Sequence, residues 1–564
     1  MYQINGAMKQ SRNFHVIFLL AFIVVFAGCG NKKDDDKSIS PDEMDDHVEA
    51  KIASLLKGTA AKSKLDDSTV LSFSPVVNYY YAATAFKPVW SSMEKWKPYT
   101  DSLIQYIAAS EKDGLFPDNY QYAALQSIMQ NLQADSLKRK DVNVWARADI
   151  LMTNAFFHIL QDLKQGRIQP DSIAWKNNGG QHEKFFSAYI KKLQQGESIS
   201  SIVASVQPSL KDYQALKKNI PLFLDSMDRT SYSYVNYPGK DSLSLLKNVL
   251  KRLAESGYNI PTGKPDSTML RELITKYQKA KGLKQTGKVS AGLASVLNST
   301  DKEKFKRIAI TLDRYKQLPA TLPEKYIWVN LPAYSLKVWD NDSLAMESKV
   351  IVGKPGTPTP VINSEISDLI VYPTWTVPNS IIVKEILPGL KRNPGYLARK
   401  GLGLYSSKGD PVDPYTVNWS KYSKGIPYLV RQGSGDNNAL GVIKFNFANP
   451  YAVYLHDTNQ RYLFKNKERS LSHGCVRVQD WEKLAFYIMR NDSVNSRQPD
   501  SLKANTDSIT TWISRKERHS IVIKQKLPVF IRYFGCEGGT ASIKFYDDIY
   551  GEDKKLRDKY FAQK

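Results

Sequence analysis

The spacing of hydrophobic residues changes near Lys325, and this change constrains the fold of the 564-residue chain more than any other feature. Before it, apolar residues recur every three or four positions, as in residues 150–163, which predicts helices. After it, apolar and polar residues alternate, as in residues 326–329 and 334–339, which predicts strands. A chain of this length also exceeds one ordinary domain. We therefore expect a multidomain α+β protein whose helical domains precede a mostly-β domain.

Turns and breaks in the pattern divide the chain into candidate domains. In chain order, the expected units are a helical scaffold domain (71–235, completed by 299–322), a small three-helix unit (240–298), a mostly-β domain (325–530) and a C-terminal extension (531–564). Within the mostly-β domain, residues 379–440 lose the alternation and are interrupted by proline and glycine. A stretch of this length inside a β domain predicts an inserted lid subdomain.

The N-terminus has the pattern of an export signal. Lys9 and Arg12 precede an apolar run over residues 16–27, and Cys29 follows. About twelve apolar residues are too few to span a bilayer as a helix. Small residues before a cysteine resemble the lipobox of bacterial lipoproteins, whose cysteine is lipidated after cleavage. We expect a signal peptide over residues 1–28, lipidation at Cys29 and a polar, disordered tether over residues 29–70. The alternative is a plain secretory signal with an incidental cysteine.

Charge and cysteine content narrow the classes of function. The formal net charge is +23, but Lys and Arg are interleaved with acidic residues, which favours solubility and attraction to an anionic envelope over nucleic-acid binding. The chain has three cysteines, Cys29, Cys475 and Cys536. An exported protein usually oxidises or loses a thiol unless its chemistry is used. Cys536 lies in no motif and is expected to be a lone thiol, which leaves Cys475 as the candidate nucleophile.

A nucleophilic thiol needs a base, and two histidines compete for that role. His473 lies two residues before Cys475, whereas His456 lies at the end of a predicted strand. The rigid strand end favours His456, because the imidazole must be held close to sulfur. Its other ring nitrogen needs an acceptor, for which the backbone carbonyl of Asp457 or a side chain would serve.

The residues around the cysteine suggest how a substrate would be held. Gly474 permits close approach of a substrate carbonyl, and the amides of Gly474 and Cys475 are candidate oxyanion-hole donors. Arg477 would either bind a carboxylate or pin the loop. A metal site is not expected, because no further close ligand pair accompanies these residues. A buried, inert cysteine is the alternative interpretation.

Longer motifs resemble those of a known family. The signature of the L,D-transpeptidase (YkuD) catalytic domain is matched by Tyr454-Leu455-His456-Asp457-Thr458 and Ser472-His473-Gly474-Cys475-Val476-Arg477-Val478. Residues 86–90, 375–378 and 438–441 resemble the large, YcbB-like branch, in which a helical scaffold and a peptidoglycan-binding domain precede the catalytic domain. Residues 240–298 resemble the three-helix peptidoglycan-binding domain through their order of Gly-Tyr, Tyr-Gln, Gly-Leu and Gly-x-Val.

The resemblance implies a wall enzyme that releases D-alanine from a tetrapeptide stem and forms 3→3 cross-links through a cysteine thioester. The implied site residues are Cys475 as nucleophile, His456 as general base and acid, Asp457 as orienting carbonyl, Gly474 and His473 in the nucleophile loop, and Arg477, Trp375 and Ser472 toward substrate. Residues 379–440 would form the lid. No metal or organic cofactor is implied, and carbapenems should acylate Cys475.

The same resemblance implies partners and a location. The partners would be peptidoglycan tetrapeptide stems as donor and acceptor, a membrane through the N-terminal lipid, and other wall-synthesis proteins, with no nucleic acid. The chain would work in cell-wall organisation and cell shape on the periplasmic side of the envelope, anchored to the outer membrane of a Gram-negative bacterium.

Three alternatives stay open. An L,D-carboxypeptidase would resolve the same thioester with water. A protein-directed cysteine protease lacks support, since the papain-type Cys-Gly-Ser-Cys-Trp signature is absent. A non-catalytic wall-anchoring lipoprotein would use only the small three-helix unit.

Overall fold

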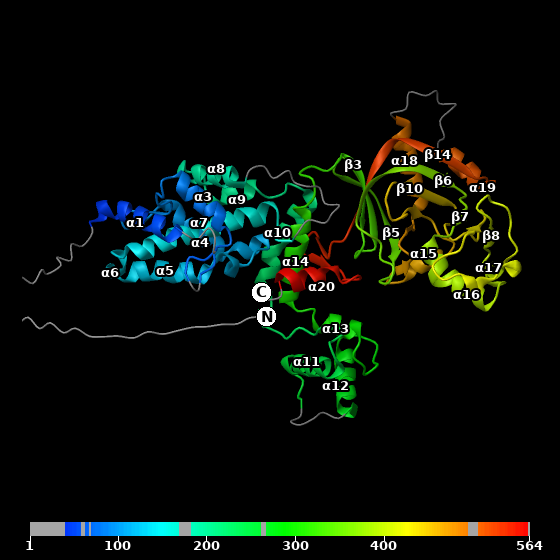
Figure 1. Cartoon of the computed structure of the whole chain (residues 1–564), viewed down its shortest axis with the longest axis horizontal. Helices are drawn as coiled ribbons and strands as arrows, with labels where there is room; N and C mark the ends of the chain where they lie inside the picture. Colours follow the sequence, from blue (N-terminus) through cyan, green and yellow to red (C-terminus); the bar gives the residue numbers. More distant parts are fainter. Residues whose placement is uncertain are drawn as a thin grey trace, which may run out of the picture.

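The computed structural model describes residues 40–57, 63–66, 69–168, 182–260, 267–494 and 506–561. The molecule is elongated, with a helical body at one end and a β-rich domain at the other (Figure 1). A small helical unit projects from the junction between them. The prediction of a multidomain α+β fold is therefore confirmed.

The scaffold is built around α7 (Val142–Lys164), which buries side chains on nearly every face and so forms the centre of its core. The elements packed around it are α1 (Pro41–Leu56), α3 (Ser74–Ala83), α4 (Pro98–Ala108), η1 (Ser110–Asp113), η2 (Pro117–Tyr120), α5 (Tyr122–Ala134), α6 (Ser136–Arg139), α8 (His182–Gln194), α9 (Ile199–Ser205) and the hairpin of β1 (Ser91–Ser92) and β2 (Lys95–Trp96).

Helix α1 corrects the prediction of a disordered tether over residues 29–70. Met44, Val48, Ile52 and Leu56 recur every fourth residue and are buried in the scaffold core. A capping box between Ser40 and Glu43 begins the helix. Acidic residues lie between these apolar positions, so the sequence pattern alone did not predict the helix. The expected signal peptide and Cys29 lie outside the described residues, and among the described helices none has the length and apolar content to cross a membrane.

A buried carboxylate connects α7 to the turn over residues 86–90. Asp149 Oδ1 accepts hydrogen bonds from Tyr81 Oη (2.5 Å) and Val89 N (2.8 Å), and Oδ2 accepts one from Trp90 N (2.8 Å). Burial raises the pKa of Asp149, and these donors oppose that rise. Residues 86–90, one of the motifs of the sequence, thus form a turn that Asp149 attaches to α7 through hydrogen bonds.

The small unit contains α11 (Ser242–Glu255), α12 (Ser267–Ala280) and α13 (Ala291–Leu297) around its own core. Buried Gln278 accepts hydrogen bonds from the amides of Thr286 (2.8 Å) and Gly287 (2.9 Å), so the Tyr-Gln motif shapes a turn. At the base of the unit, Val235 N donates to Asn298 Oδ1, and Asn298 Nδ2 donates back to Val235 O, both at 2.8 Å.

The junction between the two large domains has a shared hydrophobic core. Its helices are α10 (Lys211–Asp225) and α14 (Asp301–Tyr315), and Trp328 and Phe530 of the β domain pack into it. The C-terminal extension covers this junction with β15 (Cys536–Gly538), β16 (Ile543–Phe545), α20 (Glu552–Leu556) and η8 (Arg557–Phe561). Gly538 is required here, because a Cβ atom would lie 2.4 Å from the backbone of Ala215.

The β domain is a closed sheet. Its strand order is β12-β5-β13-β11-β10-β6-β14-β3-β4, and β4 also pairs with β5, which closes the sheet into a barrel. The strands are β3 (Lys325–Asn330), β4 (Ser335–Asp340), β5 (Ser343–Gly353), β6 (Ile362–Val371), β10 (Ile443–Phe447), β11 (Leu455–His456), β12 (Ser470–Ser472), β13 (Val476–Val478) and β14 (His519–Arg532). Helices α18 (Trp481–Val494) and α19 (Thr506–Ser514) and the turn η6 (Arg461–Lys465) complete the domain.

Residues 379–440 form a separate lobe with its own core at the outer end of the β domain (Figure 1). Its elements are α15 (Asn379–Ile381), η3 (Ile382–Ile386), α16 (Leu387–Arg392), α17 (Tyr396–Arg399), β8 (Gly403–Tyr405), η4 (Pro414–Thr416), η5 (Trp419–Lys421) and β9 (Leu429–Gln432). Strand β7 (Trp375–Thr376) joins β8 and β9 in a small sheet. We call residues 379–440 the lid.

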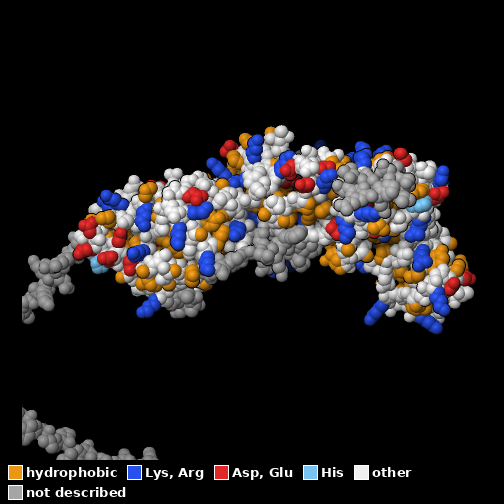
Figure 2. Space-filling view, turned by 90° about the horizontal axis from the view of Figure 1, so that it is seen from above, with side chains coloured by type: hydrophobic (Ala, Val, Ile, Leu, Met, Phe, Trp, Pro, Cys, Tyr) orange, Lys and Arg blue, Asp and Glu red, His pale blue; other side chains and the backbone are white. Residues whose placement is uncertain are grey.

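The surface charge is dispersed. In Figure 2, Lys and Arg side chains are spread over the visible face and alternate with Asp and Glu. This distribution matches the interleaving of basic and acidic residues along the chain.

We predict that Asp149→Ala destabilises the scaffold by about 3–5 kcal/mol, because it leaves Tyr81 and two backbone amides without their acceptor. Hydrogen exchange of the α7 amides in the full chain would measure the change in opening free energy. The control is Asp135→Ala, which removes an exposed N-cap of α6 and should cost about 1 kcal/mol. Equal effects of the two variants would contradict the prediction.

Candidate active site

One face of the barrel wall collects the polar side chains of the site. Strands β11 and β13 pair in parallel, with Leu455 opposite Val476 and His456 opposite Arg477. A hydrogen bond from Val476 N to Tyr454 O (3.1 Å) continues the pairing by one residue. Opposed residues of paired strands point to the same side of a sheet. The side chains that share this face are therefore Tyr454, His456, Cys475 and Arg477.

His456 and Cys475 are diagonal neighbours across this strand pair. A strand separation of ~4.8 Å and a rise of ~3.3 Å per residue put their Cα atoms about 8 Å apart, which two side chains can bridge. In the structure Cys475 Sγ lies 3.8 Å from the carbonyl oxygen of Ala452.

The surroundings of Cys475 hold it as a thiol at rest. The side chain keeps partial solvent contact, yet protein atoms enclose much of it. This enclosure raises the pKa of Cys475, although hydrogen bonds from the backbone and phenol of Tyr454 and the charges of Lys444 and Arg477 favour the thiolate. The Lys444 ammonium lies 4.0 Å from the centre of the Tyr454 ring. The site thus contains donors and cations ready for an anionic sulfur.

His456 is neutral at rest. Its side chain is 4% exposed, and burial together with the nearby Arg477 charge lowers its pKa to about 3. Backbone groups of Asp457 and Leu440 favour the charged ring. Nδ1 nevertheless makes no hydrogen bond of standard geometry within the described part of the chain. The backbone carbonyls of Asp457 and Leu440 are therefore the two candidates for the group that orients the imidazole of His456.

Hydrogen bonds fix the shape of the nucleophile loop, residues 472–475. Ser472 Oγ donates to Cys475 O (2.6 Å) and accepts from Gly474 N (3.1 Å). Gly474 has φ +124°, a conformation that favours glycine. Thr359 Oγ1 donates to Gly474 O (2.8 Å) from the neighbouring loop. Ser472 is buried and its hydroxyl is occupied within the loop, and the bond from Gly474 leaves the Cys475 amide as the freer oxyanion donor.

An ion pair between buried Asp457 and exposed Arg461 supports the strand end that carries the histidine. Asp457 is fully buried, and its carboxylate binds Arg461 through Nε (3.0 Å) and Nη2 (2.6 Å). It also accepts a hydrogen bond from Val442 N (3.1 Å). The Asp457 side chain thereby ties the end of β11 to the start of β10, which limits the movement of the adjacent His456.

Two further predicted residues, Trp375 and Arg477, contact groups around the Cys475 thiol. Trp375 forms a hydrogen bond with Tyr454, which in turn contacts Cys475. Arg477 Nη1 donates to Gln460 Oε1 (3.2 Å), while its buried Nε has no hydrogen-bond partner among the residues described. Both roles proposed for Arg477, carboxylate binding and loop support, fit this partial pairing.

His473 contacts the lid. Its Nε2 lies 2.5 Å from Glu385 Oε1, and the Lys354 ammonium lies 3.4 Å from both atoms. Partial burial would raise the pKa of Glu385, but the contacts with His473 and Lys354 lower it below its usual value. This arrangement places His473 toward the lid, on the outer side of the nucleophile loop.

Sequence reasoning missed Lys444, Glu385 and Lys354 as members of the site. Lys444 has a signal in the strand pattern, since it alternates with buried Ile443 and Phe445 and pairs with His456. Glu385 lies 88 residues from His473 and gives no local signal. Within the described ranges, no group of three His, Cys, Asp or Glu side chains is arranged to hold a metal ion.

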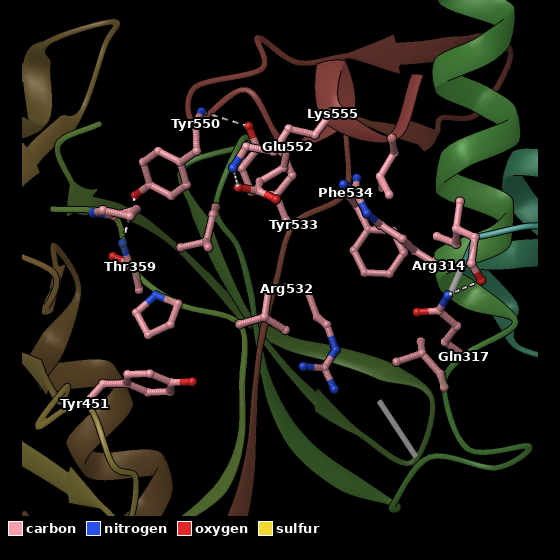
Figure 3. Close-up of a pocket in the computed structure, with 17 residues that line it drawn as sticks. Arg314, Gln317, Thr359, Tyr451, Arg532, Tyr533, Phe534, Tyr550, Glu552 and Lys555 are labelled. Atoms are coloured by element: carbon pink, nitrogen blue, oxygen red, sulfur yellow. Dashed lines mark hydrogen bonds and ion pairs between the residues drawn. The ribbon is translucent and has the colours of Figure 1, made fainter. Parts of the chain in front are cut away.

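A cavity of about 450 Å³ lies beside the nucleophile loop, between the barrel and α14. Thr359 and Tyr451 line one side, Arg314 and Gln317 line the other, and Arg532 lies between them (Figure 3). Neither Cys475 nor His456 lines this cavity. It adjoins the site through Thr359, which holds the nucleophile loop.

Family models match two parts of the chain. Residues 324–495 match the L,D-transpeptidase catalytic domain (YkuD), and residues 75–220 match the Scaffold domain. A Haemophilus influenzae protein named "Putative L,D-transpeptidase" is 33% identical over 250 residues, which cover 44% of this chain. The chain spans about half (48%) of the length of that relative.

Solved structures of L,D-transpeptidases are also similar. The enzyme from Stackebrandtia nassauensis is 17% identical, with a TM-score of 0.15, over 46% of this chain and 91% of its own. L,D-transpeptidase 1 of Mycobacterium tuberculosis is 10% identical, with a TM-score of 0.14, over 37% of this chain and 61% of its own.

The Ser-His-Gly-Cys-Val-Arg motif between β12 and β13 lies inside the region that matches the catalytic domain. Helix α7 and most of the helices around it lie inside the region that matches the Scaffold domain. The chain therefore contains a YkuD-type L,D-transpeptidase catalytic domain joined to a Scaffold domain.

Proposed function

We propose that the chain is a peptidoglycan L,D-transpeptidase that forms 3→3 cross-links through a thioester at Cys475. One observation carries the proposal most directly: Cys475 and His456 lie on the same face of paired strands inside the matched catalytic domain. The hydrogen-bonded loop around Cys475 holds the thiol in place, and preorganisation of this kind favours attack on a bound carbonyl.

In the first half of the reaction, Cys475 Sγ attacks the carbonyl carbon of the third stem residue. The C–S bond forms, the C–N bond to the terminal D-alanine breaks, and His456 passes the thiol proton to the leaving amine. A pKa of about 3 makes the protonated imidazole a ready acid for that step. It also makes proton transfer unfavourable at rest, so the thiolate forms as the substrate enters, aided by Tyr454, Lys444 and Arg477.

In the second half, the side-chain amine of another stem attacks the thioester. The new C–N bond forms, the C–S bond breaks, and the proton released by the amine returns to sulfur through His456. Water in place of the amine would give a tripeptide, which is the L,D-carboxypeptidase reaction. We infer that the lid, whose Glu385 contacts His473 in the nucleophile loop, limits the access of water to the thioester and so favours the amine route.

We place the protein in the cell envelope, on the periplasmic side, with Cys29 lipidated and held in the outer membrane of a Gram-negative bacterium. The export-signal pattern of the first residues and the wall substrate support this location. The small three-helix unit would hold peptidoglycan strands, supported by its resemblance to the peptidoglycan-binding domain. Tetrapeptide stems are the proposed donors and acceptors, alongside other wall-synthesis proteins.

We predict that Cys475→Ala abolishes every product, because it removes the atom that forms the thioester. Purified sacculi incubated with the protein and analysed by mass spectrometry should gain 3→3 dimers and lose tetrapeptides. The control is Cys536→Ala, which removes a buried thiol in the junction core, distant in sequence, and should retain activity. Dimers formed by Cys475→Ala would disprove the thioester, and unchanged sacculi with the native protein would favour a wall anchor.

We predict that acylation of the free enzyme by a carbapenem accelerates with pH, by roughly tenfold per unit below the thiol pKa. Burial raises the pKa of Cys475 above its ordinary value, so the thiolate fraction still grows above pH 8. His456 has a pKa of about 3 and stays neutral down to that pH, so its protonation adds no inflection near pH 6.5. Mass spectrometry of the Cys475 adduct over time measures the rate. A rate that levels off near pH 6.5 would instead indicate a preformed thiolate–imidazolium pair.

A further inference from the structure

The strongest unexplained feature is the charged cluster between the lid and the nucleophile loop. Glu385 Oε1 lies 2.5 Å from His473 Nε2 and accepts a hydrogen bond from the Lys354 ammonium (3.4 Å). The second carboxylate oxygen, Oε2, makes no hydrogen bond within the described ranges, and the Glu385 side chain is 43% exposed. A carboxylate can accept several hydrogen bonds at once. Glu385 therefore presents a solvent-facing acceptor next to the loop that holds Cys475.

The backbone segments that carry Glu385 and Lys354 are anchored, although the charged ends of their side chains are exposed. Ile382 and Ile386, which flank Glu385 on η3, are buried in the lid core. Lys354 N donates to Ser472 O (2.9 Å), so the residue is attached to the nucleophile loop through its backbone. Exposed ion pairs contribute little stability, so their ends can exchange partners at small cost. The carboxylate thus has a defined position and replaceable partners.

Glu385 is the acidic residue that the lid directs to the nucleophile loop. The other acidic residues of the lid are engaged elsewhere: Asp410 with Ser406, Asp413 at the start of η4, and Asp436 with Tyr372 and Lys516. The lid otherwise carries many Lys and Arg residues. Its single carboxylate beside His473 is therefore a local departure from a basic surface.

We propose that Glu385 binds the side-chain ammonium of the acceptor stem beside the nucleophile loop, an inference that rests on the proposed transpeptidation. The bound group releases one proton to solvent and attacks the thioester on Cys475 as the neutral amine. In the resting structure the ammonium of Lys354 lies beside Oε1, so this carboxylate already accommodates a primary ammonium. His473 lies two residues from Cys475, and two residues of extended chain span at most about 7 Å. An acceptor bound at Glu385 thus lies beside the nucleophile loop that carries the reacting sulfur.

The proposal separates the two halves of the reaction. Acylation of Cys475 needs no acceptor amine, so loss of the Glu385 charge should leave it unchanged. Resolution of the thioester by an amine should weaken, while resolution by water should continue. Lys354 competes with the acceptor for the same carboxylate, so its removal should act in the opposite direction.

The test uses Glu385→Gln, which keeps the size and hydrogen-bonding capacity of the side chain but removes its charge. The control is Lys384→Gln, which removes an exposed charge from the adjacent lid residue that has no place in this cluster. Each full-chain variant is assayed for carbapenem acylation of Cys475, for the KM of an amine-bearing tetrapeptide acceptor, and for the ratio of 3→3 dimer to tripeptide.

We expect Glu385→Gln to raise the acceptor KM by roughly tenfold, as for loss of one partly exposed charge-assisted hydrogen bond, and to shift products toward tripeptide. Acylation should stay within about twofold, Lys384→Gln should match the native protein, and Lys354→Met should lower the acceptor KM by about twofold to threefold. An unchanged acceptor KM, or an equal fall in acylation, would overturn the proposal. If the native protein acylates but yields only tripeptide, transpeptidation itself fails, which the Cys475 adduct distinguishes from an inactive preparation.

Discussion

The parallel pairing of β11 with β13 is the constraint on which the site depends. It brings two chain segments into one register, so that the imidazole and the thiol emerge on one side of the barrel wall. The same pairing places Tyr454 beside the thiol and Arg477 beside the imidazole. A slip of one residue would turn the side chains of the displaced strand, Tyr454 and His456 in the case of β11, toward the core. The ion pair of Asp457 with Arg461 and the hydrogen bonds of the nucleophile loop oppose that slip.

The electrostatics of this face describe a resting enzyme rather than an activated one. Burial favours neutral forms of both Cys475 and His456, whereas nearby donors and cations favour an anionic sulfur. A site of this kind stays unreactive toward solutes that do not fill it, since burial opposes the charged pair. In the proposed reaction, substrate entry would supply the remaining change in environment. The lid has its own core, and Asp436 and Asn438 attach it to the barrel domain through Tyr372 and Pro373.

The sequence predicted the parts of this protein that depend on local patterns. Hydrophobic spacing predicted the order of helical and β domains, and the cysteine motif identified the loop around Cys475. Helix α1 was missed because acidic residues separate the members of its apolar stripe. Lys444 and Glu385 were missed because their contacts with the site arise from strand register and lid folding, which no short motif records. The orientation of Ser472 into the loop likewise emerges only from the folded backbone.

The small three-helix unit is closed at its base by the reciprocal hydrogen bonds between Val235 and Asn298. The two segments that enter and leave the unit are thus held side by side, while the flanking helices α10 and α14 meet in the junction core without it. This architecture would allow the unit to be exchanged for a different module while the surrounding helices keep their packing.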